Sequence, residues 1–348
     1  MEKFRLPLVK LSGSFIALMF MFLVITSCNK EENVQPPLQE DLPDLVTALE
    51  SFDEEVEYSD AEGENARWGA IKKKTPTFFT LAAALKYTGL FIPVVQNRLT
   101  VFAPTDEAFN ELGINLWNIR KQDKDFLTSV ILYHAAAGFI YSNDLPACSL
   151  AMLDGSFTGF KYQMGKVFIN DATDDFAQVI FTDKKALNSV FHGIDKVLIP
   201  PTETIAGIAS GNDNFDILVG LLGAANLAGV VNDPDQNLTV FAPTDAAFKS
   251  LTGLTDEDEI IEALAVNPLL TEILLHHVAA GSTFSFCLTD GQSIPTLNED
   301  NLTVDLGNLE LSSSSGNVAG LVPGLLDIHA NNGVIHVINA VLLPAPKP

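Results

Sequence analysis

Apolar residues along the chain follow two periods, which alternate in a fixed order. Helical spacing of apolar positions predicts helices over residues 78–87, 126–136, 215–227 and 269–280. Gly89 and Gly229 follow two of these segments, and glycine suits the end of a helix. Short runs rich in Val, Thr, Phe and Ile predict strands over residues 99–103, 167–170, 179–181, 238–242, 302–306 and 334–340. Helices therefore precede most strands in each half, which favours an α+β class over a doubly wound parallel sheet.

A polar turn follows the first predicted strand of each half. The turns are Pro104-Thr105-Asp106 and Pro243-Thr244-Asp245, and each is followed by a helical pattern whose alanine and phenylalanine are predicted to turn inward. The Thr or Asp side chain offers an oxygen to the first free N–H groups of that helix, so these residues are predicted N-caps.

The two halves repeat each other in three places. Residues 99–106 are identical to residues 238–245, an offset of 139 positions. Segment 131–134 matches 274–277, and segment 190–200 matches 334–344 at close to the same offset. An internal repeat of this length indicates two domains of similar fold, which we place at residues 76–201 and 212–345.

The N-terminus has the pattern of an export signal. Basic residues precede an apolar run over 11–25, which is shorter than a membrane-spanning helix and fits a signal peptide over residues 1–27. The run ends in Ile-Thr-Ser-Cys28, which resembles a bacterial lipobox with Cys28 as the lipidated residue. A membrane anchor or ordinary secretion with an incidental cysteine is the alternative. Residues 29–32, Asn-Lys-Glu-Glu, are similar to the signal that sends Bacteroidetes lipoproteins to the cell surface, or are simply the charged start of a tether.

The segment after Cys28 is strongly acidic and poor in apolar residues. We interpret residues 28–75 as a tether, because such a composition cannot bury enough apolar surface to order itself. Within it, residues 44–52 have helical spacing and could form a short helix that docks on a domain. The whole chain has a formal net charge of -24, which disfavours nucleic acid as a partner.

The repeated segments resemble the signatures of the fasciclin-like (FAS1) domain family. Residues 100–109 and 239–248 are similar to its first signature, Tyr133-His134 to its Tyr-His motif, and residues 190–200 and 332–344 to its second signature. Copy two departs from copy one in having His276 in place of Tyr133, and Asn339 in place of Asp195. The resemblance covers residues 76–345. It implies two tandem FAS1-like domains, each a wedge-shaped β-sandwich flanked by helices, with roles in adhesion and no catalytic residues.

The motif residues are expected to be structural. Histidines 134 and 277 fall on predicted helices, and histidines 192 and 336 fall in apolar strands, where an imidazole is expected to donate to a backbone carbonyl and join helix to strand. The structural motif residues are Thr105, Asp106, Tyr133, His134, His192, Asp195, Thr244, Asp245, His277 and His336.

Candidate chemistry beyond these motifs is sparse. The sequence holds no Gly-x-Ser-x-Gly elbow, no glycine-rich phosphate loop and no set of residues with metal-ligand spacing, so we expect no enzymatic activity, no cofactor and no metal site. The acidic run at 255–262 suits the start of a helix, and it lacks the spacing of a calcium loop. Cys148 and Cys287 lie in different copies, so we expect them to stay unpaired as small buried residues.

Together these features predict a lipoprotein of the outer membrane, exposed at the cell surface, that adheres to an extracellular matrix or polymer. The expected partner is a protein or glycan at the surface, with the membrane contacted through the lipid anchor alone. The alternative is a lipoprotein that captures a glycan or small ligand for an outer-membrane uptake system. Two linked modules would raise avidity for a repetitive partner.

Overall fold

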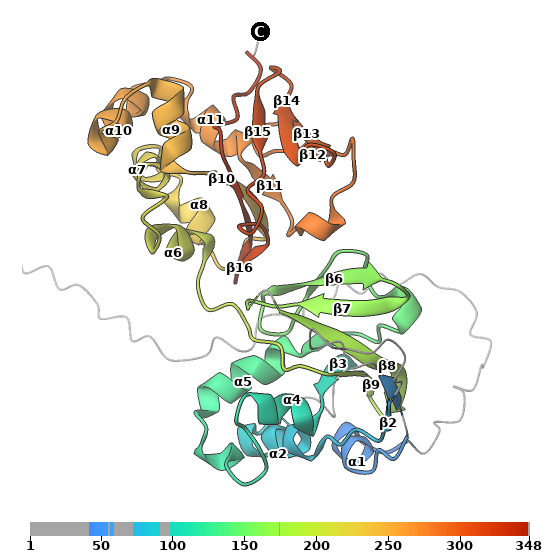
Figure 1. Cartoon of the computed structure of the whole chain (residues 1–348). Coiled ribbons are helices and arrows are strands. Elements are labelled where there is room, and N and C mark those ends of the chain that lie inside the picture. The colour runs from blue at the N-terminus through green and yellow to red at the C-terminus, as the bar shows by residue number, and fades with distance from the viewer. Residues whose placement is uncertain (1–41, 55, 59–71, 91–97, 174, 347–348) are drawn as a thin grey trace, which may run out of the picture. The chain divides into compact units, whose positions relative to one another are not determined.

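The computed structural model describes residues 42–54, 56–58, 72–90, 98–173 and 175–346 (Figure 1). The predicted signal peptide, Cys28 and the export signal at residues 29–32 lie outside these residues. Within the described ranges, no helix has the length and apolar character needed to cross a membrane.

The elements of the first half run from an N-terminal helix to a long hairpin. The helices are α1 (Leu45–Glu50), α2 (Phe79–Thr88), α4 (Asp106–Glu111), η1 (Ile119–Lys121), α5 (Lys124–Tyr133) and η2 (Ser142–Asp144). The strands are β1 (Val56–Tyr58), β2 (Lys72–Lys74), β3 (Leu99–Pro104), β4 (Ala135–Ala137), β5 (Ser149–Ala151), β6 (Phe157–Gln163), β7 (Lys166–Asn170), β8 (Phe176–Ala186) and β9 (Ser189–Ile194).

A single sheet organises the described part of the first half. Its strand order is β4-β3-β9-β8-β7-β6-β5, and β1 pairs separately with β2. The two signature strands β3 and β9 lie side by side in parallel, with Phe102 opposite His192. The long strand β8 runs past β9 on one side and β7 on the other, and its register shifts between Val179 and Lys184. The first and second signatures therefore meet side by side, as the second and third strands of this sheet.

The second half repeats this order of elements. Its helices are α6 (Ile205–Ser210), α7 (Asp216–Ala224), α8 (Ala228–Asn232), α9 (Asp245–Thr252), α10 (Glu257–Ala265), α11 (Leu270–His276) and η3 (Ser285–Cys287). Its strands are β10 (Leu238–Pro243), β11 (Val278–Ala280), β12 (Ser293–Pro295), β13 (Asn301–Asp305), β14 (Glu310–Ser313), β15 (Val318–Gly320), β16 (Ile328–Ala330) and β17 (Gly333–Ile338).

Two sheets replace the one long sheet in the second half. Among the described residues their orders are β11-β10-β17-β16 and β12-β13-β14-β15. The signature strands β10 and β17 are again parallel neighbours, with Phe241 opposite His336. Residues 321–327 separate β15 from β16, whereas the matching part of the first half is the continuous strand β8. Loop residues in the second copy therefore divide what is one curved sheet in the first.

Helix α1 contributes to the core of the first half. Its residues Leu45, Val46 and Leu49 are buried in the same cluster as Phe78 and Leu81. Asp44 caps this helix by accepting from the N–H of Thr47. The docked helix that the spacing of residues 44–52 allowed is therefore present, and this part of the segment interpreted as a tether packs on the fold that follows.

The predicted elements match the observed ones best at their starts. Gly89 ends α2 with a left-handed conformation, φ 85°, as predicted. Gly229 does not end the next such helix, because α7 stops at Ala224 and the glycine lies within α8.

The predicted helices 126–136 and 269–280 also end earlier than expected. The alanine-rich residues after α5 and α11 form β4 and β11 instead, because they pair with the edges of β3 and β10.

Candidate functional site

The first signature forms two linked caps in each copy. Thr105 accepts from the N–H of Ala108 at 3.1 Å and caps α4, as predicted. Asp106 reaches instead to α2, where its Oδ1 accepts from Thr80 N–H at 2.6 Å and its Oδ2 from Phe79 N–H at 3.2 Å. A Thr-Asp pair therefore begins one helix and holds the start of another.

Copy two uses the same pair with a different result at the aspartate. Thr244 caps α9 by accepting from Ala247 N–H. Asp245 Oδ1 accepts from Ile217 N–H at 2.9 Å at the start of α7. Its Oδ2 is buried and has no hydrogen-bond partner among the described residues. The two copies therefore place equivalent carboxylates in different surroundings.

His134 joins the end of α5 to the chain that leaves the central sheet. Its Nδ1 donates to the carbonyl of Val130 at 2.7 Å, and its Nε2 accepts from the N–H of Leu198 at 2.9 Å. Burial lowers its pKa to about 4, so the ring is neutral at pH 7 and can accept at one nitrogen. The expected structural role, in which an imidazole donates to a backbone carbonyl, matches these contacts.

His277 makes the same contacts in copy two. Its Nδ1 donates to the carbonyl of Ile273 at 2.7 Å, and its Nε2 accepts from Leu342 N–H at 2.9 Å. Burial lowers its pKa to about 4 as well. We call these two arrangements, His134 with its partners and His277 with its partners, the histidine clasps. Both rings lie at the C-cap of a helix rather than within it.

The residue that precedes each clasp histidine in the sequence is buried in both copies, although it is a tyrosine in one and a histidine in the other. Tyr133 is fully buried, its hydroxyl donates to the carbonyl of Phe157 at 3.4 Å, and burial raises its pKa. His276 is also fully buried, with its Nδ1 3.2 Å from Asn298 Oδ1. Neither side chain is available at the surface, so the Tyr-to-His difference between the copies is a difference of core packing.

His192 of β9 belongs to a network with a serine and an aspartate. Ser142 donates to Asp183 through both its N–H, at 2.7 Å, and its hydroxyl, at 2.5 Å. The N–H of Asp183 donates to His192 Nδ1 at 3.3 Å, and His192 Nε2 donates to the carbonyl of Ile140 at 2.9 Å. Asp183 has a left-handed backbone, φ 65°, which this network stabilises.

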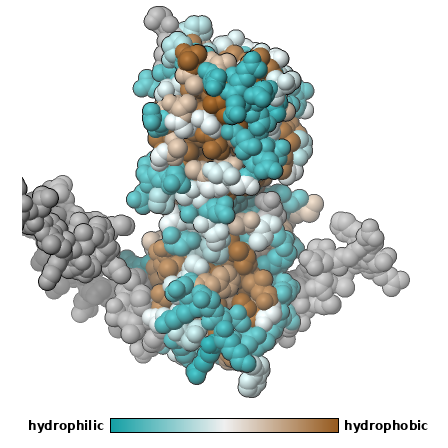
Figure 2. All heavy atoms as spheres, turned by 90° about the vertical axis from the view of Figure 1, so that its left-hand side faces the viewer, coloured by the Kyte–Doolittle hydropathy of each residue, from teal (hydrophilic) through white to brown (hydrophobic). Residues whose placement is uncertain are grey.

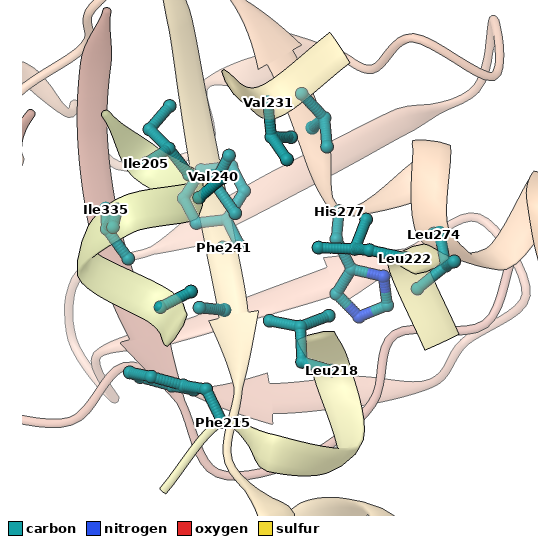
Figure 3. A pocket seen from close by; sticks show the side chains of 14 residues that line it. Ile205, Phe215, Leu218, Leu222, Val231, Val240, Phe241, Leu274, His277 and Ile335 are labelled. Atoms are coloured by element: carbon teal, nitrogen blue, oxygen red, sulfur yellow. The ribbon is translucent and has the colours of Figure 1, made fainter. Parts of the chain in front are cut away.

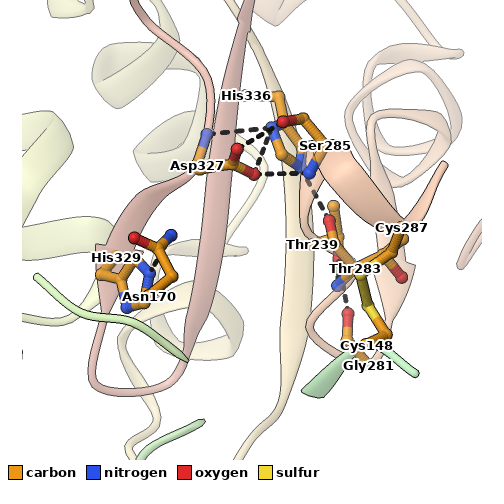
Figure 4. Close-up of polar contacts among 10 residues, drawn as sticks. All are labelled: Cys148, Asn170, Thr239, Gly281, Thr283, Ser285, Cys287, Asp327, His329 and His336. Atoms are coloured by element: carbon orange, nitrogen blue, oxygen red, sulfur yellow. Dashed lines mark hydrogen bonds and ion pairs between the residues drawn. A yellow bond between two sulfur atoms is a disulfide. The ribbon is translucent and has the colours of Figure 1, made fainter. Parts of the chain in front are cut away.

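The network recurs in copy two (Figure 4). Ser285 donates to Asp327 through its N–H and its hydroxyl, and Asp327 N–H donates to His336 Nδ1 at 3.2 Å. His336 Nε2 donates to the carbonyl of Thr283 at 2.8 Å, and Asp327 has φ 59°. Sequence reasoning missed both networks, although in each copy an aspartate precedes the strand histidine by nine residues.

These networks contain the residue types of a Ser-His-Asp hydrolase triad, but their hydrogen bonds connect the three side chains differently. In a triad the serine hydroxyl hydrogen-bonds to the histidine, which takes its proton. Here each serine hydroxyl donates to the aspartate, and each histidine Nε2 is occupied by a backbone carbonyl. The arrangement fixes the 3₁₀ turns η2 and η3 against the sheet and does not activate a nucleophile.

Asp195 and Asn339 occupy equivalent places after β9 and β17. Asp195 Oδ1 accepts from Gln178 N–H at 2.6 Å, and Asn339 Oδ1 accepts from Gly320 N–H at 2.8 Å. Burial raises the pKa of Asp195 to about 6. The same backbone contact is therefore made by a costly carboxylate in copy one and by a neutral amide in copy two.

Cys148 and Cys287 form a disulfide between the copies, so the expectation that they stay unpaired is wrong (Figure 4). Their Cα atoms are 5.4 Å apart although 139 residues separate them in sequence. Two cysteines that belong to different repeats can still lie close together in the folded chain. The Ser285–Asp327–His336 network fixes the position of one of the two cysteines. Cys287 is the last residue of the turn η3, and Asp327 holds this turn by accepting a hydrogen bond from Ser285.

Other contacts accompany the disulfide. Asn170 Nδ2 and His329 Nε2 are 2.9 Å apart, and burial lowers the pKa of His329 to about 4 (Figure 4). The ring centroids of Phe176 and Phe286 are 5.8 Å apart. A Cβ at Gly159 would come within 2.6 Å of the Phe286 ring, so this strand position requires glycine. The disulfide therefore lies beside a packed contact.

An apolar cavity of about 30 Å³ lies inside the second half (Figure 3). Its wall includes Phe215, Leu218 and Leu222 of the helical layer and His277 of the clasp. A pocket for a drug-sized ligand has a volume of roughly 300–1,000 Å³. This cavity is a packing gap in the core of one copy and has no room for a sugar.

Comparisons with known proteins agree with the repeat. The family model described as Fasciclin domain matches residues 76–200 and 213–344. Protein sll1483 of Synechocystis is 37% identical over 128 residues, which cover 36% of this chain and 68% of that protein.

More distant similarities extend over both repeats. Transforming growth factor-beta-induced protein ig-h3 of Sus scrofa is 29% identical over 261 residues, covering 73% of this chain and 34% of the relative. This chain thus spans about a third of the length of that relative. A solved FAS1 domain pair from the insect cell adhesion molecule fasciclin I covers 76% of this chain and 95% of its own, with 18% identity and a TM-score of 0.34.

Proposed function

Because the chain belongs to the fasciclin domain family, a family of non-enzymatic adhesion proteins, we propose that it is a cell-surface adhesion lipoprotein. Its partner in this proposal is an extracellular-matrix protein or a polymer such as a glycan. The observation that carries the proposal is the pair of fasciclin domains, since two modules on one chain can engage a repetitive partner together. The disulfide adds a fixed connection between the modules.

The disulfide also supports the exported location in the proposal. Disulfides form and persist in oxidising compartments such as the periplasm and the cell surface, and they are rare in the cytosol. A lipid on Cys28 would then hold the protein in the outer membrane, and Lys30 with its acidic neighbours would direct it to the outer face. We further propose 76–201 and 212–345 as the bounds of the two domains.

Exposed apolar side chains indicate where a partner could bind. Trp117 is 92% exposed and lies beside half-exposed Leu116 and Leu112, in the segment between α4 and α5. In copy two, Val266 and Leu269 are exposed between α10 and α11. Figure 2, viewed from the side on which α5 and α10 lie in Figure 1, shows hydrophobic residues among hydrophilic ones on this helical face. Contiguous apolar surface is typical of interaction sites, and these exposed side chains are our candidates for it.

The alternative is a lipoprotein that captures a glycan or small ligand for uptake. The lipid anchor serves this function equally well, but the apolar cavity in the second domain is too small for such a ligand. The two functions differ in the phenotype they predict, because loss of a capture protein would impair growth on one nutrient and leave attachment intact.

The experiment replaces the chromosomal gene by one that lacks residues 76–345 and keeps the anchor. We expect attachment to a matrix-coated surface and biofilm cohesion to fall while growth on all nutrients stays normal. The double variant Leu116→Ala/Trp117→Ala should reduce attachment in part, and Met164→Ala, another exposed position, should not. Normal attachment by the deletion strain would reject adhesion, and a nutrient-specific growth defect would establish capture in its place.

A further inference from the structure

Three acidic side chains from three helices converge in the second domain. Asp216, Asp245 and Glu257 are the first residues of α7, α9 and α10. Each offers a carboxylate oxygen, and these oxygens lie within 4.8 Å of one another. Calcium binds oxygen ligands at about 2.3–2.6 Å, so two ligands of one ion are at most about 5 Å apart. The spacing therefore allows all three carboxylates to share one cation.

Asp245 provides a second observation that points to a ligand. Its side chain is only 6% exposed, and its Oδ1 is used by the N–H of Ile217. Its Oδ2 is buried without any hydrogen-bond partner in the described part of the chain. A buried carboxylate oxygen without a donor is costly, and a bound cation would satisfy it.

One ammonium group already lies at this cluster. Lys249 Nζ is 2.7 Å from Glu257 Oε1, and its side chain is 35% exposed. One positive charge against three carboxylates leaves a net charge of about two negative units when all are ionised. A divalent cation would neutralise that remainder, and the long lysine side chain can move into solvent to admit it.

Among its described residues the first domain has no such cluster, and it serves as an internal comparison. Asp106, the counterpart of Asp245, has both carboxylate oxygens occupied by backbone N–H groups of α2. Phe79 is the first residue of α2, where α7 begins with Asp216. The unsatisfied oxygen and the acidic neighbour therefore occur together in copy two.

We propose that Asp216, Asp245 and Glu257 form a calcium site in the second domain. The ion would join the starts of α7, α9 and α10, with water completing its coordination on the exposed side of Asp216. Calcium suits the site better than magnesium, which demands a tighter octahedral geometry and releases water reluctantly. A site of three carboxylates that is open to solvent on the side of Asp216 resembles weak extracellular sites, whose dissociation constants are on the order of 10⁻⁴ to 10⁻³ M. This proposal does not depend on adhesion.

Isothermal titration of the full-length protein in detergent, stripped with EDTA, with calcium chloride tests the site. We expect one site of roughly that affinity, together with a rise in the melting temperature that EDTA reverses. Asp216→Asn and Glu257→Gln should each weaken binding about tenfold or more, because each removes one of three charged ligands. Glu259→Gln, an exposed carboxylate on the same helix, should leave the affinity unchanged and is the matched control.

The variant Lys249→Met distinguishes two possibilities, a calcium site and an acidic cluster whose charge is offset by Lys249 alone. The calcium site predicts tighter binding in this variant, because the competing ammonium is gone. A failure to detect calcium binding in both the wild type and Lys249→Met would overturn the proposal. Binding that survives Asp216→Asn and Glu257→Gln unchanged would overturn it as well, since the ion would then lie elsewhere.

Discussion

The two domains agree most closely in the side chains that hold buried backbone groups. The histidine clasps have equal distances in both copies, 2.7 Å from Nδ1 to a helix carbonyl and 2.9 Å from a backbone N–H to Nε2. The Ser-Asp-His networks also recur with the same donors and acceptors. A buried backbone group must find a partner, so the side chain that supplies it is retained in both repeats.

The domains differ where solvent or a neighbour can compensate. Asp195 becomes Asn339, and Asp245 belongs to a cluster of three carboxylates that has no counterpart at Asp106 among the described residues. The strand β8 is divided into β15 and β16. The comparison indicates that the signatures encode the connection of helix to sheet, whereas charge and loop length are free to diverge and give each domain its own surface.

Breaking the disulfide should have the largest effect, because it alone joins the two domains covalently beyond the main chain. The double variant Cys148→Ser/Cys287→Ser releases a loop of 139 residues, which in the chain-entropy account costs about 5 kcal/mol of stability. Calorimetry of the full chain should show a lower melting temperature and separate transitions for the two domains.

Treating the wild type with a reductant should reproduce that calorimetric trace, and should not alter the double variant. An unchanged melting temperature in the variant would mean that the packed contact around Phe176 and Phe286 holds the domains together without the disulfide.

Removing either histidine clasp should cost about 3 kcal/mol, and the same in each copy. His134→Ala and His277→Ala each leave a buried backbone N–H, of Leu198 or Leu342, without its acceptor and create a cavity. Urea unfolding of the full chain at pH 7 measures the cost. Unequal losses in the free energy of unfolding would show that the two clasps contribute differently to stability despite their equal geometry.

The pH dependence of that cost provides a check. Each folded-state pKa of about 4 lies below the value of 6.5 for a free imidazole. As the pH falls, the histidine of the unfolded chain is therefore protonated before the buried histidine of the folded chain. The stability that each neutral imidazole contributes to the fold is complete above pH 6.5, and it declines as the pH falls toward 4, by up to about 3 kcal/mol for each ring. The penalty of each alanine variant should shrink over the same range. A constant penalty would contradict the neutral, accepting imidazole.

Asp195→Asn should make copy one resemble copy two and stabilise it by about 2 kcal/mol at pH 7. The folded-state pKa of about 6 lies above the ordinary 3.8, so the ionised carboxylate costs stability at neutral pH. That cost is relieved as pH falls from 6 to 3.8, and the gain from asparagine should vanish there. The reciprocal variant Asn339→Asp should lose stability at pH 7. Urea unfolding of both variants at pH 7 and pH 4 provides the test, and a gain that persists at pH 4 would exclude the charge as its cause.

The sequence predicted the parts of the fold that depend on local contacts. The starts of the helices, the threonine caps and the signature strands follow from residues close together in the chain. The ends of α5 and α11 did not, because the alanines that follow favour a helix locally and are drawn into the sheet by β3 and β10. Pairing with a distant strand overrides local propensity.

The missed site features all join distant segments. The disulfide spans 139 residues, and the Asp183–Ser142 and Asp327–Ser285 contacts span 41 and 42. The acidic cluster draws one residue from each of three helices, so the spacing within any one of them gave no indication of it. The aspartate nine residues before each strand histidine was the one signal in the sequence that could have revealed a network.

The central claim is that the tandem domains stand outside the cell, where they can adhere. Protease treatment of intact cells tests it most directly, with both domains followed by immunoblot and a periplasmic protein as the control for lysis. We predict that the domains are removed from intact cells while the periplasmic protein survives, and that Cys28→Ser cells lose the anchored protein. Full protection of both domains in intact cells would contradict the account and place the protein on the inner side of the outer membrane.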